Sequence, residues 1–565
     1  MGQASRDLTL HAGTTLTGMV GAWNWNFTGN YDRATSRTTT DRGFDIGDYQ
    51  ARVIGEGANP FATLSPGDVD PLSQDRARST VSSGNAQLVV NGTLFRLPAG
   101  AVSTTVKIAG ETRSLESRSV RSDIEAEAEL SRDIGTGQIS IDVPIASRRA
   151  DVLAFAGDLS ANFNVAVDRL SDFGTLTTYG YGLTWKPDPK LTLLASFAED
   201  EGAPTVQQLG NPTIVTTGVR VFDYVRGETV EISQVTGGNP ALDADNRRVI
   251  KLGATLKPLD ETDLSITANY VDSRIRNPIA SFPTATAAIE AAFPERFTRD
   301  DEGRLLRIDS RPVNFQRQDR TELRWGINFS KRLSEPPREP RERGQGGEQP
   351  SLRDLAQGGE ANRAEAPPTG GTGGDRDIRG GGERGNWRPG GGPPGGFRGP
   401  GGGPRGTRLQ LAAYHTVHFK DEILIRDGVP VLDLLDGAAI GSSGGQPRHE
   451  IEGQAGITHN GLGARLSLNW QSSTSVDGTA TGGTGLDFSD LTTLNLRLFA
   501  DLGAQRSFVE SHPFFRRTRI SLGVNNLTNA RIRVRDETGE TPLSYQPAYL
   551  DALGRSVRLS FRKLF

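Results

Sequence analysis

Apolar and polar residues alternate along this chain in runs of about ten residues. From Leu159 to Val167 every second residue is apolar, and the residues between them are serine, asparagine or alanine. A period of two places apolar side chains on one face of a β-strand and polar side chains on the other. The pattern predicts about seventeen strands, at 8–17, 22–31, 86–97, 102–113, 137–145, 157–167, 176–186, 190–198, 248–257, 262–272, 321–333, 408–419, 449–458, 462–472, 491–502, 517–527 and 555–565.

The connections between these strands alternate in length. Short connections lie at 186–190, 258–262 and 459–461, and long polar ones lie at about 199–246, 272–320, 421–449 and 472–490. Short turns at one end and long loops at the other are typical of an outer-membrane barrel. Its sheet must close, because unpaired backbone groups cannot face lipid. We therefore predict an all-β fold, a transmembrane antiparallel β-barrel with long extracellular loops.

Two soluble all-β folds also show alternation. The strands of a sandwich are shorter, and its apolar face needs a partner sheet. A propeller should repeat every 40–45 residues or so, and no such repeat is visible. The membrane barrel is therefore the favoured interpretation.

Aromatic residues concentrate near the ends of the predicted strands, where a barrel meets the membrane–water interface. The residues that we assign to these interfaces are Trp23, Trp25, Tyr31, Tyr181, Trp185 and Trp470.

Composition removes several classes of function. The chain has 565 residues and no cysteine, which excludes disulfides, thiolate zinc sites and cysteine nucleophiles. The net charge of −4 argues against a nucleic-acid binder. No run of about 18 apolar residues suits a transmembrane helix, and the N-terminal sequence lacks the apolar region of a signal peptide.

Glycine is abundant, with 69 residues, and much of it lies in one segment. Residues 335–406 are rich in Gly, Pro and Arg, a composition that buries too little apolar surface to fold. We predict a barrel part at 1–334, a disordered insertion at 335–406 and a C-terminal barrel part at 407–565. The insertion should lie at the end of the short turns, and we expect it to bind no nucleic acid.

The chain ends on an amphipathic strand with an aromatic residue in last place, the form by which barrels are recognised for membrane assembly. We assign this assembly role to Gly554, Val557, Leu559, Phe561 and Phe565. The stretch 195–209, which enters a long loop, and Asn525-Asn-Leu-Thr-Asn529 with the following Gly554-Arg555 and Phe565 resemble TonB-dependent outer-membrane receptors.

The resemblance implies a 22-stranded barrel filled by an N-terminal plug, in the outer membrane of a Gram-negative cell. It implies three partners: outer-membrane lipid, a small-molecule ligand, and the inner-membrane energy-coupling protein TonB. TonB would be engaged through an N-terminal part that is missing here, because neither the plug nor the TonB-engaging segment is found. The 16–17 predicted strands are about five fewer than 22. We expect the upstream part of the barrel to be missing too.

A receptor of this kind is not an enzyme, and we expect no catalytic residue, metal or cofactor. It takes up a scarce ligand, siderophore-like or another small nutrient, through its extracellular loops. Within those loops we expect ligand contacts from Arg274, Arg276, Arg296, Arg299 and Tyr545. Two alternatives remain: a passive porin-like channel, and a surface-binding β-protein outside the membrane.

Three short motifs match chemistry that we do not expect here. Residues 441–445 fit the nucleophile-elbow pattern but lie in a long loop with no helix after them. Residues 401–406 fit a dinucleotide-binding pattern but precede a strand. His415 and His418 are three apart on a predicted strand, so they should face opposite sides.

Overall fold

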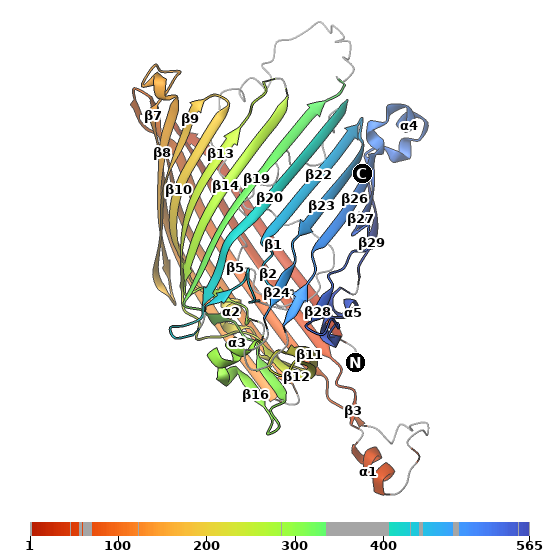
Figure 1. The fold of residues 1–565 in the computed structure, drawn as a ribbon. Helices are drawn as coiled ribbons and strands as arrows, with labels where there is room; N and C mark the ends of the chain where they lie inside the picture. The colour runs from red at the N-terminus through yellow and green to blue at the C-terminus, as the bar shows by residue number, and fades with distance from the viewer. Residues whose placement is uncertain are drawn as a thin grey trace.

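Most of the chain forms one antiparallel sheet that curves into a barrel wall (Figure 1). The computed structural model describes residues 3–45, 47–55, 59, 70–121, 124–260, 262–283, 285–334, 406–429, 431–439, 444–477, 485–551 and 553–563. Within this part of the chain the sheet has 18 strands, and one of them, β21 (Leu432–Asp433), has only two residues. The long strands are β1 (Gln3–Val20), β2 (Trp23–Thr40), β5 (Asp75–Leu97), β6 (Gly100–Arg121), β7 (Ile124–Ala146), β8 (Asp158–Leu170), β9 (Gly174–Asp188), β10 (Leu191–Gly202), β13 (Asp245–Leu256), β14 (Asp263–Arg276), β19 (Arg317–Arg332), β20 (Thr407–Leu424), β22 (His449–His459), β23 (Leu462–Gln471), β26 (Leu491–Asp501), β27 (Thr518–Asn525) and β29 (Ser556–Lys563).

Each long strand pairs antiparallel with the next long strand along the chain, so the wall is a series of hairpins. Every strand that the alternating pattern predicts overlaps one of these long strands, which confirms the antiparallel all-β architecture. Among the described residues, β1 pairs only with β2, and β29 pairs only with β27. The expected total of 22 strands stays a prediction.

The outer face of the wall carries the apolar half of each strand. On β14, Ile266 is exposed, whereas Val271 on the other side of the strand is buried. Exposed apolar side chains on strands whose inner face is covered form a surface suited to lipid. We call this surface the apolar band; its members include Leu8, Leu10, Leu16, Phe163, Tyr181, Leu252, Ile266, Trp325, Ile327, Leu411, Ile451, Leu466 and Leu559.

Two tryptophans of β2 lie against glycines of the neighbouring strands. A Cβ atom added to Gly18 on β1 would lie 2.6 Å from the Trp25 ring, and one added to Gly92 on β5 would lie 2.6 Å from the Trp23 ring. The two rings therefore pack directly on the glycine backbone, and a larger residue at either glycine would displace the ring. The two glycines thus allow the tryptophan rings to lie flat on the outer face of the wall.

The two ends of the barrel differ as the connection lengths predict. The C-terminus and the short turns lie at one end, which we call the turn end (Figure 1). There Asn460 and Gly461 join β22 to β23 with φ angles of 48° and 88°, the left-handed pair that a tight Asn-Gly hairpin requires. Strands β19 and β20 also meet at this end, where Arg332 pairs with Arg408. Residues 335–405, most of the predicted insertion, lie outside the described residues.

Short elements outside the sheet complete the connections. They are β3 (Phe44–Asp45), α1 (Gly47–Gly55), β4 (Asp70–Pro71), η1 (Ala154–Ala156), η4 (Leu502–Ala504), α4 (Arg506–Ser511) and η5 (Pro513–Phe515). No helix in the described part of the chain is long and apolar enough to cross a membrane.

Candidate functional site

Five long loops gather at the end of the barrel opposite the turn end (Figure 1). They lie between consecutive long strands and contain short elements of their own. They are loop 1 (203–244), loop 2 (277–316), loop 3 (425–448), loop 4 (472–490) and loop 5 (526–555), and we call their described residues the loop body.

Short strands join the loops to one another. Loops 1 and 2 share a four-stranded sheet made of β11 (Ile214–Asp223), β12 (Glu228–Thr236), β16 (Phe297–Arg299) and β17 (Leu305–Asp309). Loops 4 and 5 share a sheet of β24 (Thr474–Val476), β25 (Leu486–Phe488) and β28 (Val534–Asp536). The remaining elements are α2 (Val206–Gly210), β15 (Ile279–Ala280), α3 (Ala287–Ala292), η2 (Pro294–Arg296), β18 (Val313–Asn314), η6 (Leu543–Tyr545) and α5 (Pro547–Leu550).

A first apolar core lies between loops 1, 2 and 3. Ile289 of α3 is fully buried there, and it shares the cluster with Ile232 of β12 and Leu434 of loop 3. Burial of a large aliphatic side chain stabilises a fold by about 1.5–3 kcal/mol. The remaining members are Phe282, Ala292, Leu305, Ile308, Val313, Phe315, Ile423, Ile425 and Leu432. These loops therefore fold as a packed unit.

A second apolar core joins loop 1 to loops 3, 4 and 5. At its centre the hydroxyl groups of Tyr224 and Tyr545 are hydrogen bonded at 3.0 Å, and the Tyr545 ring packs edge-on against Phe488. Burial raises the pKa of both phenols above the ordinary value, so both stay neutral. Phe222, Ala439, Val476, Leu486 and Val534 complete this core.

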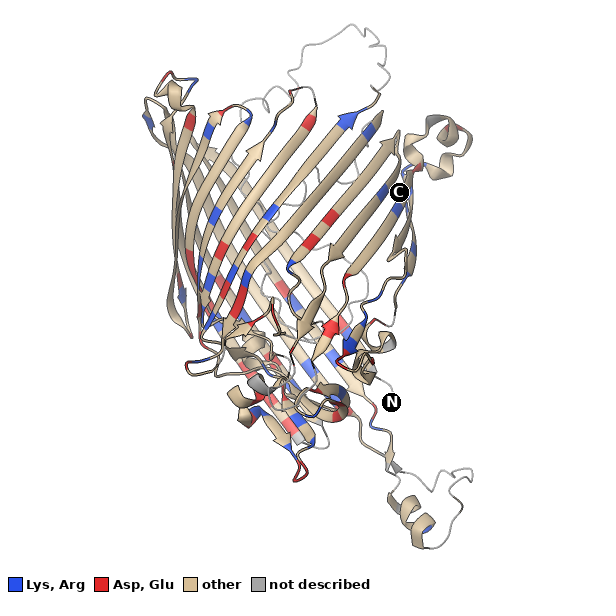
Figure 2. Ribbon diagram, in the orientation of Figure 1, with Lys and Arg blue, Asp and Glu red and all other residues tan. Residues whose placement is uncertain are grey.

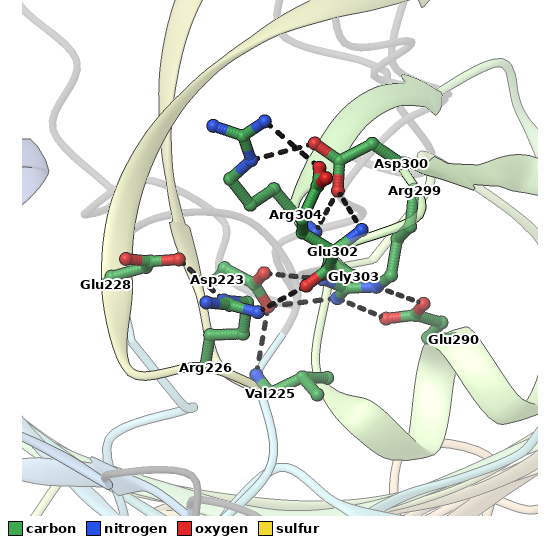
Figure 3. Close-up of polar contacts among 10 residues, drawn as sticks. All are labelled: Asp223, Val225, Arg226, Glu228, Glu290, Arg299, Asp300, Glu302, Gly303 and Arg304. Carbon is green, nitrogen blue, oxygen red and sulfur yellow. Dashed lines mark hydrogen bonds and ion pairs between the residues drawn. The ribbon is translucent and has the colours of Figure 1, made fainter.

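A charged cluster holds loops 1 and 2 together (Figure 3). The guanidinium of Arg299 donates to both carboxylate oxygens of Asp223, at 2.6 and 3.0 Å, and to both oxygens of Glu290, at 2.7 Å each. It also donates to the carbonyl oxygen of Gly303 at 2.8 Å. Hydrogen bonds to Glu290 and Asp223 raise the pKa of Arg299. Asp223 is only 1% exposed, so loss of Arg299 would leave its carboxylate buried without its ion-pair partner.

Two further arginines form ion pairs beside this cluster, and one of them also links loops 1 and 2 (Figure 3). Arg226 of loop 1 pairs with Glu228 at 2.7 Å and donates to the carbonyl oxygen of Glu302 of loop 2 at 2.9 Å. Arg304 pairs with Asp300 at 2.7 Å within loop 2. These side chains are more exposed than Arg299, so their ion pairs contribute less.

Loop 1 is fastened to the barrel wall at its start. Arg132 of β7 is buried and pairs with Asp172 at 2.6 Å, and it donates to the carbonyl oxygen of Pro204 at 2.6 Å. Helix α2 follows directly and begins with a capping box between Thr205 and Gln208. The loop body is therefore held in place by the wall as well as by its own cores.

A polar network lines the inner face of the wall beside loop 3. His418 is 1% exposed and lies between Glu322, at 3.4 Å, and Glu450, at 3.6 Å. Gln446 of loop 3 donates to Glu450 at 3.0 Å. His415 faces the other way, toward Trp325 and His449. The two histidines do lie on opposite faces, as their spacing predicts.

The structure places the five predicted ligand residues in two settings. Arg274 and Arg276 lie on the same side of β14 as Ile266, the outer side, and Arg274 pairs with Asp319 at 2.6 Å. Arg296, Arg299 and Tyr545 lie inside the loop body. Arg296 donates to the carbonyl oxygen of Arg311 and lies over the ring of Phe282. Their contact with a ligand stays a prediction.

The other assigned residues have these positions. Trp23, Trp25 and Tyr31 share one side of β2, and Tyr181 and Trp185 share one side of β9. The indole nitrogen of Trp470 donates to Asp490 of loop 4. Val557, Leu559 and Phe561 are exposed on one side of β29, and Gly554 precedes this strand with φ of +56°. Phe565 lies outside the described residues, as do Ser442 and Ser443 of the nucleophile-like motif and most of 401–406.

Residues that organise the loop body escaped the sequence interpretation. Asp223 and Tyr224 lie in a long polar loop, where no alternating run distinguishes them from solvated residues. Arg132 lies on β7 before the predicted segment 137–145. Within the described residues, no group of three or more His, Asp or Glu is arranged to hold a metal ion. The arrangement is a packed body of loops at one end of a barrel.

Comparison with known proteins gives a consistent result. The family model described as "TonB dependent receptor-like, beta-barrel" matches residues 3–527. No curated protein sequence matches the chain. The chain is similar to the outer membrane transporter YddB from Escherichia coli, with 10% identity, a TM-score of 0.52, and coverage of 99% of this chain and 62% of that one.

It is also similar to a mutant of the ferric enterobactin receptor PfeA from Pseudomonas aeruginosa. There the identity is 12%, the TM-score is 0.50, and coverage is 99% of this chain and 61% of the receptor. At such identities the likeness shows the fold alone. The chain spans about three fifths of the length of these structures.

Proposed function

Because the chain belongs to the TonB-dependent receptor family through its β-barrel, we propose that it serves energy-coupled uptake across the outer membrane. In this proposal the loop body binds a scarce ligand and the barrel is its route inward. The family and the similar structures are receptors and transporters rather than enzymes.

The observation that carries the proposal is the folding of five loops into one body at one end of the barrel. Two apolar cores and the Arg299 cluster link loops that are far apart in sequence. A passive channel needs loops that leave its mouth open. Loops that pack together suit a surface that recognises one compound and rearranges when it binds.

The ligand that we propose is a small nutrient, siderophore-like or of another scarce kind. Arginine and tyrosine in the loops suit an anionic or aromatic compound, because arginine binds carboxylates and phosphates with two parallel hydrogen bonds. Arg274, Arg276, Arg296, Arg299 and Tyr545 remain the residues that we propose for its contacts, directly or by shaping the loop surface.

We further propose the location and partners that go with this function. The apolar band would lie in the outer membrane of a Gram-negative cell, with the loop body outside. TonB would supply energy from the inner membrane, engaging the receptor on the periplasmic side. Nothing in the proposal requires a cofactor or nucleic acid.

The proposal is tested by loss and rescue of uptake. The gene is deleted, and cells are supplied with scarce nutrients one at a time at limiting concentration, among them ferric siderophores and copper. We expect uptake of one compound to be lost and then restored by the wild-type gene. A variant lacking 219–236 of loop 1 should assemble in the membrane yet fail to restore it. Equal uptake of all compounds by deleted and intact cells would contradict the proposal.

The passive channel predicts another pattern. Deletion would then lower the entry of many small solutes together, in proportion to their concentration, and the loop 1 variant would let solutes pass at least as fast. These outcomes separate the two functions whichever compound the loop body binds.

A further inference from the structure

Four arginines stand side by side on consecutive strands of the wall. Arg6 of β1 pairs with Arg37 of β2, Arg37 pairs with Arg78 of β5, and Arg78 pairs with Arg118 of β6. Neighbouring strands lie about 4.8 Å apart, so the four side chains start from a line roughly 15 Å long. We call these four residues the arginine row.

The row lies on the outer face of the barrel. On β6, Leu115 and Ser117 are buried on the inner side, whereas Arg118 on the opposite side is largely exposed. On β1, Arg6 lies on the same side as Leu8 and Leu10, which are 73% and 56% exposed. Alternation along a strand therefore puts the arginine row on the face that carries the apolar band.

The row begins where the apolar band ends. On β1 the outward residues from Leu8 to Val20 carry no charge, and Arg6 is the next outward residue toward the loop end. On β2, Arg33 is the next outward residue after Tyr31 toward the loop end. Figure 2 shows many charged residues at the loop end of the barrel.

Like charges directly opposite one another destabilise a sheet unless something compensates them. Arg118 is compensated, because it forms ion pairs with Glu125 and with Glu127 of β7. For Arg6, Arg37 and Arg78, no ion pair is present among the described residues. On this face of β6, Glu116 pairs with Thr80 and so lies diagonal to Arg78, but in the described part of the chain no ion pair joins Glu116 to an arginine of the row.

We propose that the arginine row, together with Arg33, binds the phosphate-bearing headgroups of the lipids that surround the barrel at its loop end. The guanidinium fork matches phosphate oxygens, and a line of forks matches a headgroup that carries more than one phosphate. The apolar band holds the acyl chains of the same lipid. The site needs an inserted barrel but does not depend on which ligand the loop body binds.

The test compares lipid retention by the purified, folded protein in detergent. The probes are a glycolipid with two phosphate groups and the same glycolipid after removal of both phosphates, and native mass spectrometry counts the lipids retained. The wild type should prefer the phosphorylated form. Arg6→Ser, Arg33→Ser, Arg37→Ser and Arg78→Ser combined should weaken its binding about tenfold or more, since each basic residue near a membrane surface contributes to anionic lipid binding.

Two further variants keep the result interpretable. Replacing the same four residues by lysine retains the charge and should retain most of the binding. Arg220→Ser, Arg226→Ser and Arg304→Ser remove ion-paired loop arginines at the same end and should leave lipid binding unchanged. Heat-modifiable migration reports folding for each variant, and Arg37→Ser alone, with a partial loss, replaces the fourfold variant if that one does not fold.

Three results would overturn the inference. One is equal retention of the phosphorylated and dephosphorylated lipid by the wild type. Another is unchanged retention by the folded serine variant. The third is full displacement of the lipid by millimolar inorganic phosphate, which would make this a site for free phosphate. Loss of lipid binding with intact nutrient uptake would leave the proposed function standing, so the two proposals fail separately.

Discussion

The guanidinium of Arg299 joins two loops through partners that lie 76 and 9 residues away in sequence. Its carboxylate partner Asp223 is buried, and a buried charge without a partner costs far more than an exposed ion pair contributes. At the residue scale, the shape of the loop body therefore depends on a few buried polar groups. The apolar residues around them stabilise the loop body by burial, but burial alone does not fix the orientation of one loop against another.

Removal of this arginine tests its role. Arg299→Met should destabilise the loop 1–loop 2 contact by about 3–5 kcal/mol, because Asp223 is left buried and unpaired. Hydrogen exchange should then speed up in 219–236 and 286–309 while the long strands keep their protection. The matched control is Arg304→Met at the exposed pair, which should change exchange little. Equal effects of the two substitutions would contradict the assignment.

The tyrosine pair predicts a response to alkali. Burial raises the pKa of Tyr224 and Tyr545 above the ordinary value of about 10. A raised pKa stabilises the folded state fully below pH 10 or so, and this contribution is lost as pH rises further, because only the unfolded phenols ionise. The loop body should therefore loosen above about pH 10.

Absorbance of ionised tyrosine measures this directly. In the folded protein, two of the nine tyrosines should ionise only when hydrogen exchange in loops 1 and 5 also rises. In urea all nine should ionise together. Tyr545→Phe should reduce the late component. Ionisation of all nine tyrosines near pH 10, with the loops still protected from hydrogen exchange, would contradict the burial of Tyr224 and Tyr545.

At the scale of elements, the alternation of residues explains where strands form but not where they end. Strands β5, β6 and β7 begin or extend about ten residues beyond the segments that the pattern predicts. Beyond the apolar band the outward face of these strands turns polar and charged, whereas apolar residues such as Leu115 and Leu130 lie on the inner face. The apolar side is therefore reversed there, and the predicted segments end where the outward apolar side chains end. The short strands of the loop body were missed for a related reason. Two of their pairings, β12 with β17 and β25 with β28, join different loops, and no local pattern records them.

The candidate site was predictable to a similar degree. Connection lengths identified four of the five loops and the end at which they gather. They did not identify Asp223, Tyr224 or Arg132, because the roles of these residues depend on burial, and burial arises only when distant loops meet. Arg299 was selected as a candidate ligand residue, and the structure shows in addition that its hydrogen bonds hold the loops together.

The glycines under the tryptophans of β2 give a prediction at this scale. Gly92→Ala puts a Cβ atom against the Trp23 ring, so the ring must move, at a cost of about 1–3 kcal/mol. Gly110→Ala on β6 is the control, because no atom lies within 4 Å of the added Cβ. The melting temperature in detergent should fall for the first variant only. A fall of the same size for both variants would show that the loss of stability comes from replacing a glycine in a strand and not from the contact with the ring.

At the scale of the whole molecule, three surfaces have different chemistry and different positions on the barrel. The apolar band covers the outer face of the wall, and the arginine row borders it at the loop end. The loop body lies over the same end of the barrel (Figure 1). The turn end carries the C-terminus and the hairpin of β19 and β20. This polarity suits a receptor whose recognition occurs at one end and whose energy is supplied from the other.

The most direct test of this account is the energy dependence of uptake. The nutrient lost on deletion of the gene is supplied over a range of concentrations, with and without a protonophore that discharges the inner membrane. We predict saturable uptake at low concentration that the protonophore abolishes. Uptake that rises linearly with concentration and continues when the inner membrane is discharged would contradict the receptor account and leave a passive channel.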